Sequence, residues 1–245
     1  MSDNGNDYKP DYSVLKQWPV SLWKWPKIVV YVPWPSALPD ASDVNPGFLE
    51  IARHGTMFMH LPYGFADRMR NEAAKTLLRS DYTHVLMLDS DHVHPHNIVQ
   101  KLAKHVIEDP ERLIVGGLNF TRTAPFGPCA WVFNEKDNNQ IYRIHEWEPG
   151  LIEVARLGTG SILIAREAFE RTEFPWFVNE PNMVDEMLGS HDNYFCKKAI
   201  KAGMKIWCDL SVTSPHMGSG IRVTEQTYRT FCEVNPIPQE ELIDA

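Results

Sequence analysis

The sequence lacks the features that mark secreted, membrane-spanning and zinc-ribbon proteins. Its four cysteines are widely spaced and form no CxxC pair, which fits neither a zinc ribbon nor a dense disulfide framework. No stretch reaches the roughly 18 to 20 apolar residues needed to span a bilayer. The polar, acidic start MSDNGNDYKPDYS does not have the sections of a secretory signal. We therefore expect reduced thiols, no stable membrane insertion and a soluble, cytoplasmic protein.

Basic residues are also scarce. Lysine and arginine together number 24, against 32 aspartates and glutamates, and the formal net charge is −8. Because binding to nucleic acid and to anionic membranes depends largely on Lys and Arg, this balance disfavours both as general partners. It is still compatible with a local basic groove, and so with nucleic acid as a specific acceptor.

The remaining composition is that of a globular protein. Hydrophobic residues make up 43% and charged residues 23% of 245 residues, which is enough chain for a full-sized core. We expect one domain over residues 1–245. Residues 1–20 are expected to be a flexible or peripheral N-terminal segment, and residues 219–245 a C-terminal tail.

Apolar runs alternate with helical patterns along the chain. The pattern predicts strands over 27–32, 56–62, 83–89 and 112–120, helices over 45–55, 65–79 and 95–109, a turn, strand and helix over 158–171, and a helix closed by Gly203 before a strand over 190–210. Such alternation indicates an α/β fold with a mostly parallel central sheet flanked by helices. Short apolar and polar pieces over 130–154 predict a small antiparallel hairpin at the sheet edge.

A Trp-rich stretch precedes and includes the first predicted strand. QWPVSLWKWPKIVVYVPWPS holds Trp18, Trp23, Trp25 and Trp34. Large aromatic side chains usually bury area and seal the edge of a domain, and we favour that interpretation. A sugar-stacking surface or a membrane-surface belt would use the same residues.

Two carboxylates directly follow the apolar strand HVLML. Asp89 and Asp91 flank Ser90, and ligands of open parallel sheets gather at the carboxyl ends of strands. Acids one residue apart share a side of an extended chain and can converge on one hard cation. The same residue types are common in turns and helix caps, so the pattern alone leaves both interpretations open.

Four ordered segments make the chain resemble glycosyltransferases of the GT-A fold, specifically the family-2-type group. The segments are KIVVYVP, RNEAAKTLLRSDYTHVLMLDSD, GTGSILIAREAFE, and HDNYFCKKAIKAGMKIW followed by SPHMG. The resemblance implies a Rossmann-like catalytic domain that transfers a sugar from a nucleotide-diphospho-sugar, of the UDP or GDP type, to an acceptor hydroxyl.

The resemblance also implies a metal site. Asp91 would be a direct ligand of Mn²⁺ or Mg²⁺, and His216 would complete the metal shell. Asp89 would lie near the ribose or the metal, and Ser90 beside it would bind the donor. A divalent cation suits this chemistry because it stabilises the charge that builds on the leaving diphosphate. The alternative for a lone histidine is an ordinary surface or core residue.

Asp192 matches the general base of inverting relatives, which takes the proton of the attacking hydroxyl. Relatives usually carry Glu immediately before this Asp, whereas this chain has His191. This departure weakens the match. The resemblance of Asp192 to the base favours inversion but does not establish it, because retaining enzymes share this fold. The alternative role of Asp192 is that of a helix N-cap, and the two roles are compatible.

Further positions correspond to donor-binding segments of these relatives. They are Pro33 beside the nucleotide base, Arg70 and Asn71 close to the nucleotide, and the small-residue turn Gly158, Thr159 and Gly160 near the donor sugar or acceptor. Arginine suits phosphate by its bidentate fork, and glycine lets a substrate approach the backbone. A solvated helix face and a plain tight turn are the alternatives.

Three nearby histidines, His92, His94 and His96, have no spacing of a known zinc set. We interpret them as solvated or acceptor-side residues.

Two other functions compete with glycosyl transfer. A sugar nucleotidyltransferase would need a Gly-rich, basic phosphate loop after the first strand, and VPWPSALPD is neither Gly-rich nor basic. A non-enzymatic carbohydrate-binding protein would use the Trp-rich region instead of a metal.

Overall fold

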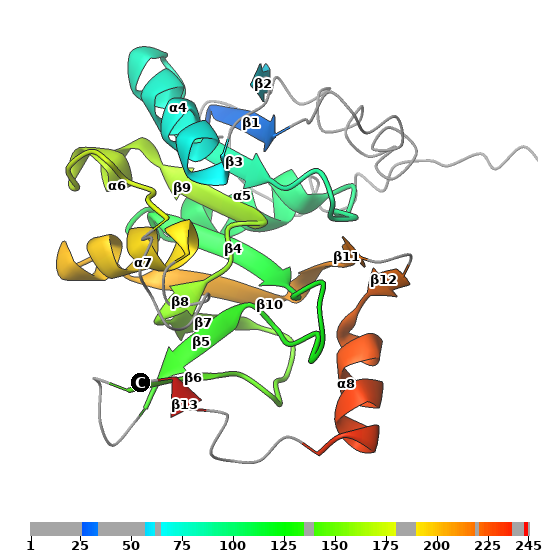
Figure 1. The fold of residues 1–245 in the computed structure, drawn as a ribbon. Coiled ribbons are helices and arrows are strands. Elements are labelled where there is room, and N and C mark those ends of the chain that lie inside the picture. Colours follow the sequence, from blue (N-terminus) through cyan, green and yellow to red (C-terminus); the bar gives the residue numbers. More distant parts are fainter. Residues whose placement is uncertain are drawn as a thin grey trace, which may run out of the picture.

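The computed structural model describes residues 26–33, 57–61, 65–134, 140–179, 190–218, 221–236 and 243–244. A seven-stranded sheet with the order β2-β1-β3-β9-β4-β10-β7 forms its centre (Figure 1). The predicted N-terminal segment over 1–20, the predicted helix over 45–55 and all four tryptophans of the Trp-rich stretch lie outside the described residues.

The central sheet is mixed, so the expectation of a mostly parallel sheet is confirmed only in part. β1 (Ile28–Pro33) pairs in parallel with β2 (Met57–Leu61) and β3 (His84–Leu88), and β4 (Ile114–Asn119) pairs in parallel with β10 (Ile206–Ser214). Between these two groups, β9 (Ser161–Ala165) runs antiparallel to both β3 and β4. β7 (Leu151–Val154) is an antiparallel edge strand beside β10.

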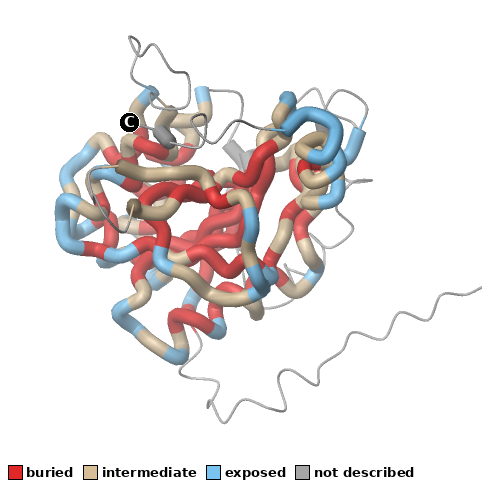
Figure 2. The backbone as a smooth tube through the Cα atoms, turned by 90° about the horizontal axis from the view of Figure 1, so that it is seen from below, coloured by how far each residue is buried: buried red, intermediate tan, exposed pale blue. Residues whose placement is uncertain are grey.

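Helices cover both faces of this sheet and confirm the α/β class. Residues of α4 (Ala66–Arg79), α6 (Arg166–Glu170) and α7 (His191–Lys201) belong to one buried cluster, and residues of α5 (Ile98–Glu108) belong to another. The strands between them are the most deeply buried part of the chain (Figure 2). Gly203 ends α7 with φ +77°, as its glycine predicts. Among the described residues, no helix has the length and apolar character to cross a membrane.

A second, smaller sheet contains the predicted hairpin. β5 (Ala130–Phe133) pairs antiparallel with β6 (Ile141–Arg143), and the order of the sheet is β13-β6-β5-β8, with β8 at Arg156–Leu157 and β13 at Ile243–Asp244. The hairpin is therefore confirmed, but it belongs to its own sheet. The antiparallel edge of the central sheet is β7.

The segment expected to be a C-terminal tail also contains regular structure. β11 (His216–Gly218) pairs antiparallel with β12 (Ile221–Val223), and α8 (Glu225–Val234) follows. The side chain of Thr224 caps α8 by accepting a hydrogen bond from the backbone N–H of Thr227. The segment over residues 219–245 that was expected to be a C-terminal tail thus contains a capped helix.

A β-bulge in β10 sets the course of the chain towards the carboxyl edge of the sheet. The register with β4 shifts between Asp209 and Thr213. Asp209 accepts hydrogen bonds from the backbone N–H and the hydroxyl of Ser211, and His105 Nε2 of α5 lies 2.7 Å from its Oδ2. Both acidic and imidazole groups are buried. This cluster fixes the bulge against α5 and so directs the residues that follow β10.

We predict that Asp209→Asn lowers the free energy of unfolding at pH 7 by about 1–3 kcal/mol, because a buried charged partner of His105 and Ser211 is lost. Burial would raise the pKa of Asp209, but His105 and Ser211 outweigh burial and lower the pKa. The stabilisation is therefore complete above the unfolded-state pKa of about 3.9 and decreases as the pH falls below it.

Urea unfolding of the wild type and the variant at pH 7 and at pH 3 measures this difference. The gap between the two proteins should narrow at pH 3. An equal gap at both pH values would contradict an ionised Asp209 as its source.

Candidate functional site

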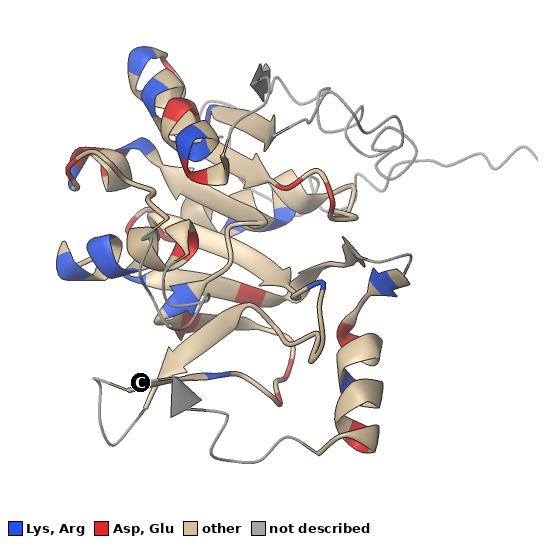
Figure 3. Ribbon diagram, in the orientation of Figure 1, with Lys and Arg blue, Asp and Glu red and all other residues tan. Residues whose placement is uncertain are grey.

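The two carboxylates of the DSD segment lie in a tight turn at the end of β3. The backbone N–H of Asp89 donates to the carbonyl of Gly160 (2.9 Å), and the N–H of His92 donates back to the carbonyl of Asp89 (3.3 Å). Acidic residues colour this turn in Figure 3, next to the end of β3. The turn is thus attached to the β8–β9 connection and projects its acids beyond the carboxyl edge of β3.

The chain returns to this turn after the bulge in β10. Backbone N–H groups of Val93 and Met217 donate to the carbonyls of Pro215 and Asp91, each at 2.8 Å. These bonds form an antiparallel bridge between His92 and His216. The two imidazole rings stack with their centroids 4.0 Å apart. Asp91 and His216, which are 125 positions apart in the sequence, therefore meet at the carboxyl end of β3.

Asp91, His92 and His216 form a candidate metal centre. One ligand atom from each residue lies within 4.8 Å of the others. Asp91 Oδ1 is 3.1 Å from His92 Nδ1, and Asp91 Oδ2 is 3.1 Å from His216 Nε2. The predicted pair of Asp91 and His216 is thus brought together. Asp89 is not in this group, and His92 takes the place that the sequence suggested for it.

The hydrogen bonds of His216 test whether a cation fits. Its Nδ1 lies 2.8 Å from the carbonyl oxygen of Phe120, and its Nε2 faces the Asp91 carboxylate. Both neighbours only accept hydrogen bonds, whereas a neutral imidazole has one N–H. The ring is satisfied as an imidazolium, or as a neutral ligand with its Nδ1–H on Phe120 and its Nε2 lone pair on a cation. The second arrangement is the usual one for metal-binding histidines.

Electrostatics keep Asp91 ionised. Burial would raise the pKa of its carboxyl group, but the hydrogen bonds from His216 and His92 outweigh burial and hold the pKa well below its usual range. Burial would lower the pKa of His216, and the Asp91 carboxylate outweighs burial and raises it. A cation that replaces the proton of His216 would meet an anionic carboxylate already in place.

His94 supports the turn from inside. It is buried, its Nδ1 lies 3.0 Å from the Ser214 hydroxyl, and its Nε2 lies 2.8 Å from the carbonyl oxygen of Asp89. Burial lowers the pKa of His94 to about 3, so the neutral ring ties the turn to the end of β10. The expectation that His92 and His94 are solvated is therefore wrong, because both are buried; His96 is exposed.

Asp89 is neutralised by a buried arginine. Nη2 of Arg70 lies 2.8 Å from Asp89 Oδ1 and 3.1 Å from Oδ2. Arg70 extends from α4, and its Nε lies 3.9 Å from Asp192 Oδ1. The arginine therefore stands between the two carboxylates. The buried hydroxyl of Tyr31 has no hydrogen-bond partner among the described residues, and the charges of Arg70 and Asp89 act on it.

Asp192 lies in the first turn of α7. The helix begins at His191, and the N-cap is Ser190, whose hydroxyl accepts from the N–H of Asn193. Asp192 is therefore not the N-cap. Thr159 donates to Asp192 Oδ1. His191 Nε2 lies 2.8 Å from the same oxygen, within ion-pair distance but not aligned as a hydrogen bond.

All contacts that Asp192 makes with the described residues involve Oδ1. Burial would raise the pKa of this carboxyl group, but His191, Arg70 and Thr159 outweigh burial and hold it well below its usual range. The group is therefore ionised, and its Oδ2 makes no hydrogen bond or ion pair with the described residues.

The turn before β9 is a close-packed glycine turn. A Cβ at Gly158 would lie 2.8 Å from Cys129 Cβ, and a Cβ at Gly160 would lie 3.0 Å from His92 Cε1. Between them, Thr159 is fully buried on Asp192. The turn thus connects the candidate metal centre with Asp192 of α7, and its glycines let the neighbouring segments approach closely.

Three other predicted residues lie in α4, in β1 and in the turn after β3. Asn71 donates to the carbonyls of Asp67 and Phe177 and accepts from the N–H groups of Trp176 and Phe177. Its amide therefore anchors the segment before α7 and does not face the carboxylates. Pro33 is the last residue of β1, opposite Leu61 of β2, and Ser90 is half-buried in the turn between the two acids.

Arg122 was not considered from the sequence. Its Nη1 lies 3.7 Å from Asp91 Oδ2. The signal for His92 in the sequence was its position next to Asp91, but His92 was grouped with His94 and His96 in the segment HVHPH and was not considered with Asp91.

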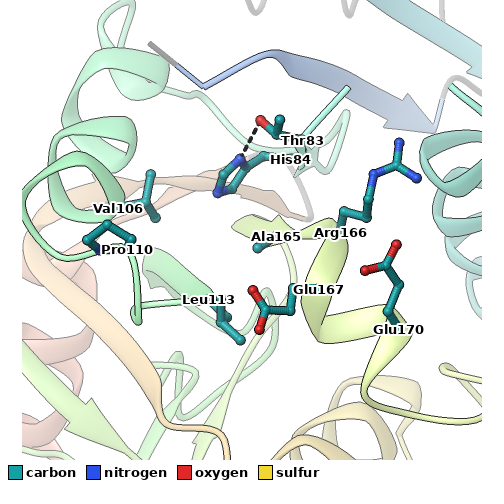
Figure 4. Close-up of a pocket in the computed structure, with 9 residues that line it drawn as sticks. All are labelled: Thr83, His84, Val106, Pro110, Leu113, Ala165, Arg166, Glu167 and Glu170. Atoms are coloured by element: carbon teal, nitrogen blue, oxygen red, sulfur yellow. Dashed lines mark hydrogen bonds between the residues drawn. The ribbon is translucent and has the colours of Figure 1, made fainter. Parts of the chain in front are cut away.

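A hollow of roughly 520 Å³ lies at the opposite edge of the sheet (Figure 4). His84, which begins β3, and Ala165, which ends β9, are among its lining residues. Arg166 contributes to its wall, but its guanidinium donates to carbonyls at the C-terminal end of α4, including Leu77 and Ser80. The hollow is thus separated from Asp89 and Asp91 by the length of β3.

Comparison with known proteins supports the fold. No family model and no curated protein matches the chain. The crystal structure of A197 from STIV is similar, with a TM-score of 0.60 over 82% of this chain and 91% of that chain. The sequence identity is 18%, so the similarity concerns the fold alone.

We predict that His92→Asn and His216→Asn each weaken Mn²⁺ binding at least ~10-fold, because each removes one donor of the candidate centre. Titration of free Mn²⁺ by electron paramagnetic resonance measures the affinity. The exposed His96→Asn is the matched control and should bind as the wild type does. Wild-type affinity in His92→Asn would show that His92 is not a ligand.

Proposed function

We propose that this protein is a metal-dependent glycosyltransferase that moves a sugar from a nucleotide-diphospho-sugar to an acceptor hydroxyl. The observation that carries the proposal is the meeting of Asp91 with His216 at one edge of the sheet, with Asp192 connected to the same turn through Arg70 and Asp89. One group in this arrangement can bind a cation, and a separate one can accept a proton.

The cation would be held by Asp91, His92 and His216. It would neutralise the negative charge that develops on the leaving diphosphate as the bond to the sugar breaks. Two imidazoles and one carboxylate suit Mn²⁺ better than Mg²⁺, because Mg²⁺ prefers oxygen ligands alone. The same donor types occur in non-haem iron sites, so Fe²⁺ belongs in any metal panel.

Asp192 would act as the general base. Its carboxylate is ionised, and Thr159 and His191 hold Oδ1 on the protein side. Oδ2 could then accept the proton of an acceptor hydroxyl while that oxygen attacks the sugar. Attack assisted by a base on the face opposite the leaving group gives inversion, which we include in the proposal.

Arg70 would reduce the repulsion between the carboxylates of Asp89 and Asp192, because its positive charge lies between them. Its guanidinium is buried and compensates Asp89 directly and Asp192 at longer range. A nucleotide bound beside β3 would meet a neutral Arg70–Asp89 pair, and repulsion between its phosphates and Asp89 would be reduced. A panel of UDP- and GDP-sugars would identify the base and the sugar of the donor.

The competing functions make different predictions about metal. A sugar nucleotidyltransferase would use the cation with a nucleoside triphosphate and a sugar phosphate. A carbohydrate-binding protein would show no metal-linked binding of nucleotides. The Trp-rich stretch on which the latter depends lies outside the described residues.

We predict that Asp192→Asn reduces metal-dependent sugar transfer or donor hydrolysis by ~10²–10⁴-fold, because the amide cannot accept the proton. The assay is release of nucleoside diphosphate from a panel of nucleotide sugars with Mn²⁺. Binding of Mn²⁺ and of the nucleoside diphosphate should be retained in the variant.

Asp81→Asn is the matched control. This aspartate is exposed and pairs with Lys27 on the far side of β3, so its loss changes the net charge equally and should leave activity unchanged. Full activity of Asp192→Asn, or equal wild-type activity after removal of all divalent metal, would contradict the proposal.

A further inference from the structure

Arg122 is a cation beside the candidate metal centre. It follows β4 in the loop that leads to β5, and its Nη1 lies 3.7 Å from Asp91 Oδ2. Its side chain is 61% exposed, whereas that of Asp91 is 32% exposed. The guanidinium therefore lies on the solvent side of Asp91, opposite the protein interior.

The backbone around Arg122 is firmly held. The N–H of Thr121 donates to the carbonyl of Gly127 (2.9 Å), and the N–H of Phe126 donates to the carbonyl of Thr123 (2.8 Å). Phe126 has φ +61° and packs edge-on against Phe231 of α8, with ring centroids 5.7 Å apart. A folded loop thus holds the base of the Arg122 side chain next to the metal candidate.

The position of Arg122 beside Asp91 disfavours a metal ion that binds without an additional anionic ligand. Asp91 Oδ2 is shared by His216 and Arg122. A divalent ion at Asp91, His92 and His216 would be only half neutralised by this single carboxylate and would lie within a few ångströms of the guanidinium. Like charges at that distance repel. The site as a whole therefore has positive charge to spare, which suits a ligand with more than one negative charge.

We propose that Arg122 is a binding residue for the diphosphate group of the donor and holds it from the solvent side while the cation holds it from the protein side. This inference rests on the proposed function. When the cation binds, Arg122 loses Asp91 as its partner and turns to non-bridging phosphate oxygens. The planar guanidinium can grip these oxygens with two hydrogen bonds.

Isothermal titration calorimetry with inorganic pyrophosphate tests the role of Arg122 without any transfer reaction. With saturating Mn²⁺, Arg122→Gln should bind pyrophosphate roughly 10- to 100-fold more weakly than the wild type, as expected for lost charge-assisted hydrogen bonds. Mn²⁺ alone should bind Arg122→Gln as tightly as the wild type or more tightly, because a neighbouring positive charge is removed. Arg122→Lys should recover part of the pyrophosphate affinity.

Arg79→Gln is the control, because it removes the same charge at an exposed position far from Asp91. Arg79 ends α4 near the start of β3. It should bind pyrophosphate as the wild type does. Unchanged pyrophosphate affinity in Arg122→Gln would overturn the inference. Loss of Mn²⁺ affinity in the same variant would also overturn it, because Arg122 would then only support the metal ligands. A wild-type protein that binds no pyrophosphate with Mn²⁺ would instead reject the proposed function itself.

Discussion

The candidate site depends on one interaction, the short antiparallel bridge between His92 and His216. Two backbone hydrogen bonds, from Val93 to Pro215 and from Met217 to Asp91, hold this bridge. Without it, Asp91 and His92 would lack the third donor of the candidate centre, and the end of β10 would carry a lone imidazole. The bridge depends in turn on the β-bulge at Asp209, because the bulge gives β10 the register from which β11 reaches the turn.

Strands β1 to β4 and helices α4, α5 and α7 followed from local patterns, but the direction of β9 did not. SILIA is buried on all five residues, and a strand buried on both faces has the same apolar pattern in either direction. Only its partners β3 and β4 decide that it runs antiparallel. The expectation of a parallel sheet came from strand and helix alternation, which predicts crossovers and cannot detect an inserted strand.

Residues of the site were predictable to the extent that they carry sequence patterns. Asp91 and His216 were paired through a family resemblance, and the structure places them together. The role of His92 was missed because ring burial and stacking on His216 arise from a contact distant in the sequence. The hydrogen-bond partners of Asn71 were missed for the related reason that Trp176 and Phe177 lie more than 100 positions away.

The two acids of the DSD turn show why adjacent, similar residues differ in chemistry. Asp89 is held by Arg70, and a guanidinium does not give up its proton in proteins. Asp91 is held by two imidazoles, which can each exchange a proton for a metal ion. A cation that approaches Asp91 can replace protons of the two imidazoles, whereas at Asp89 it would have to compete with the permanent positive charge of Arg70. The partners of the acids, and not the acids themselves, therefore decide which one is suited to hold a metal.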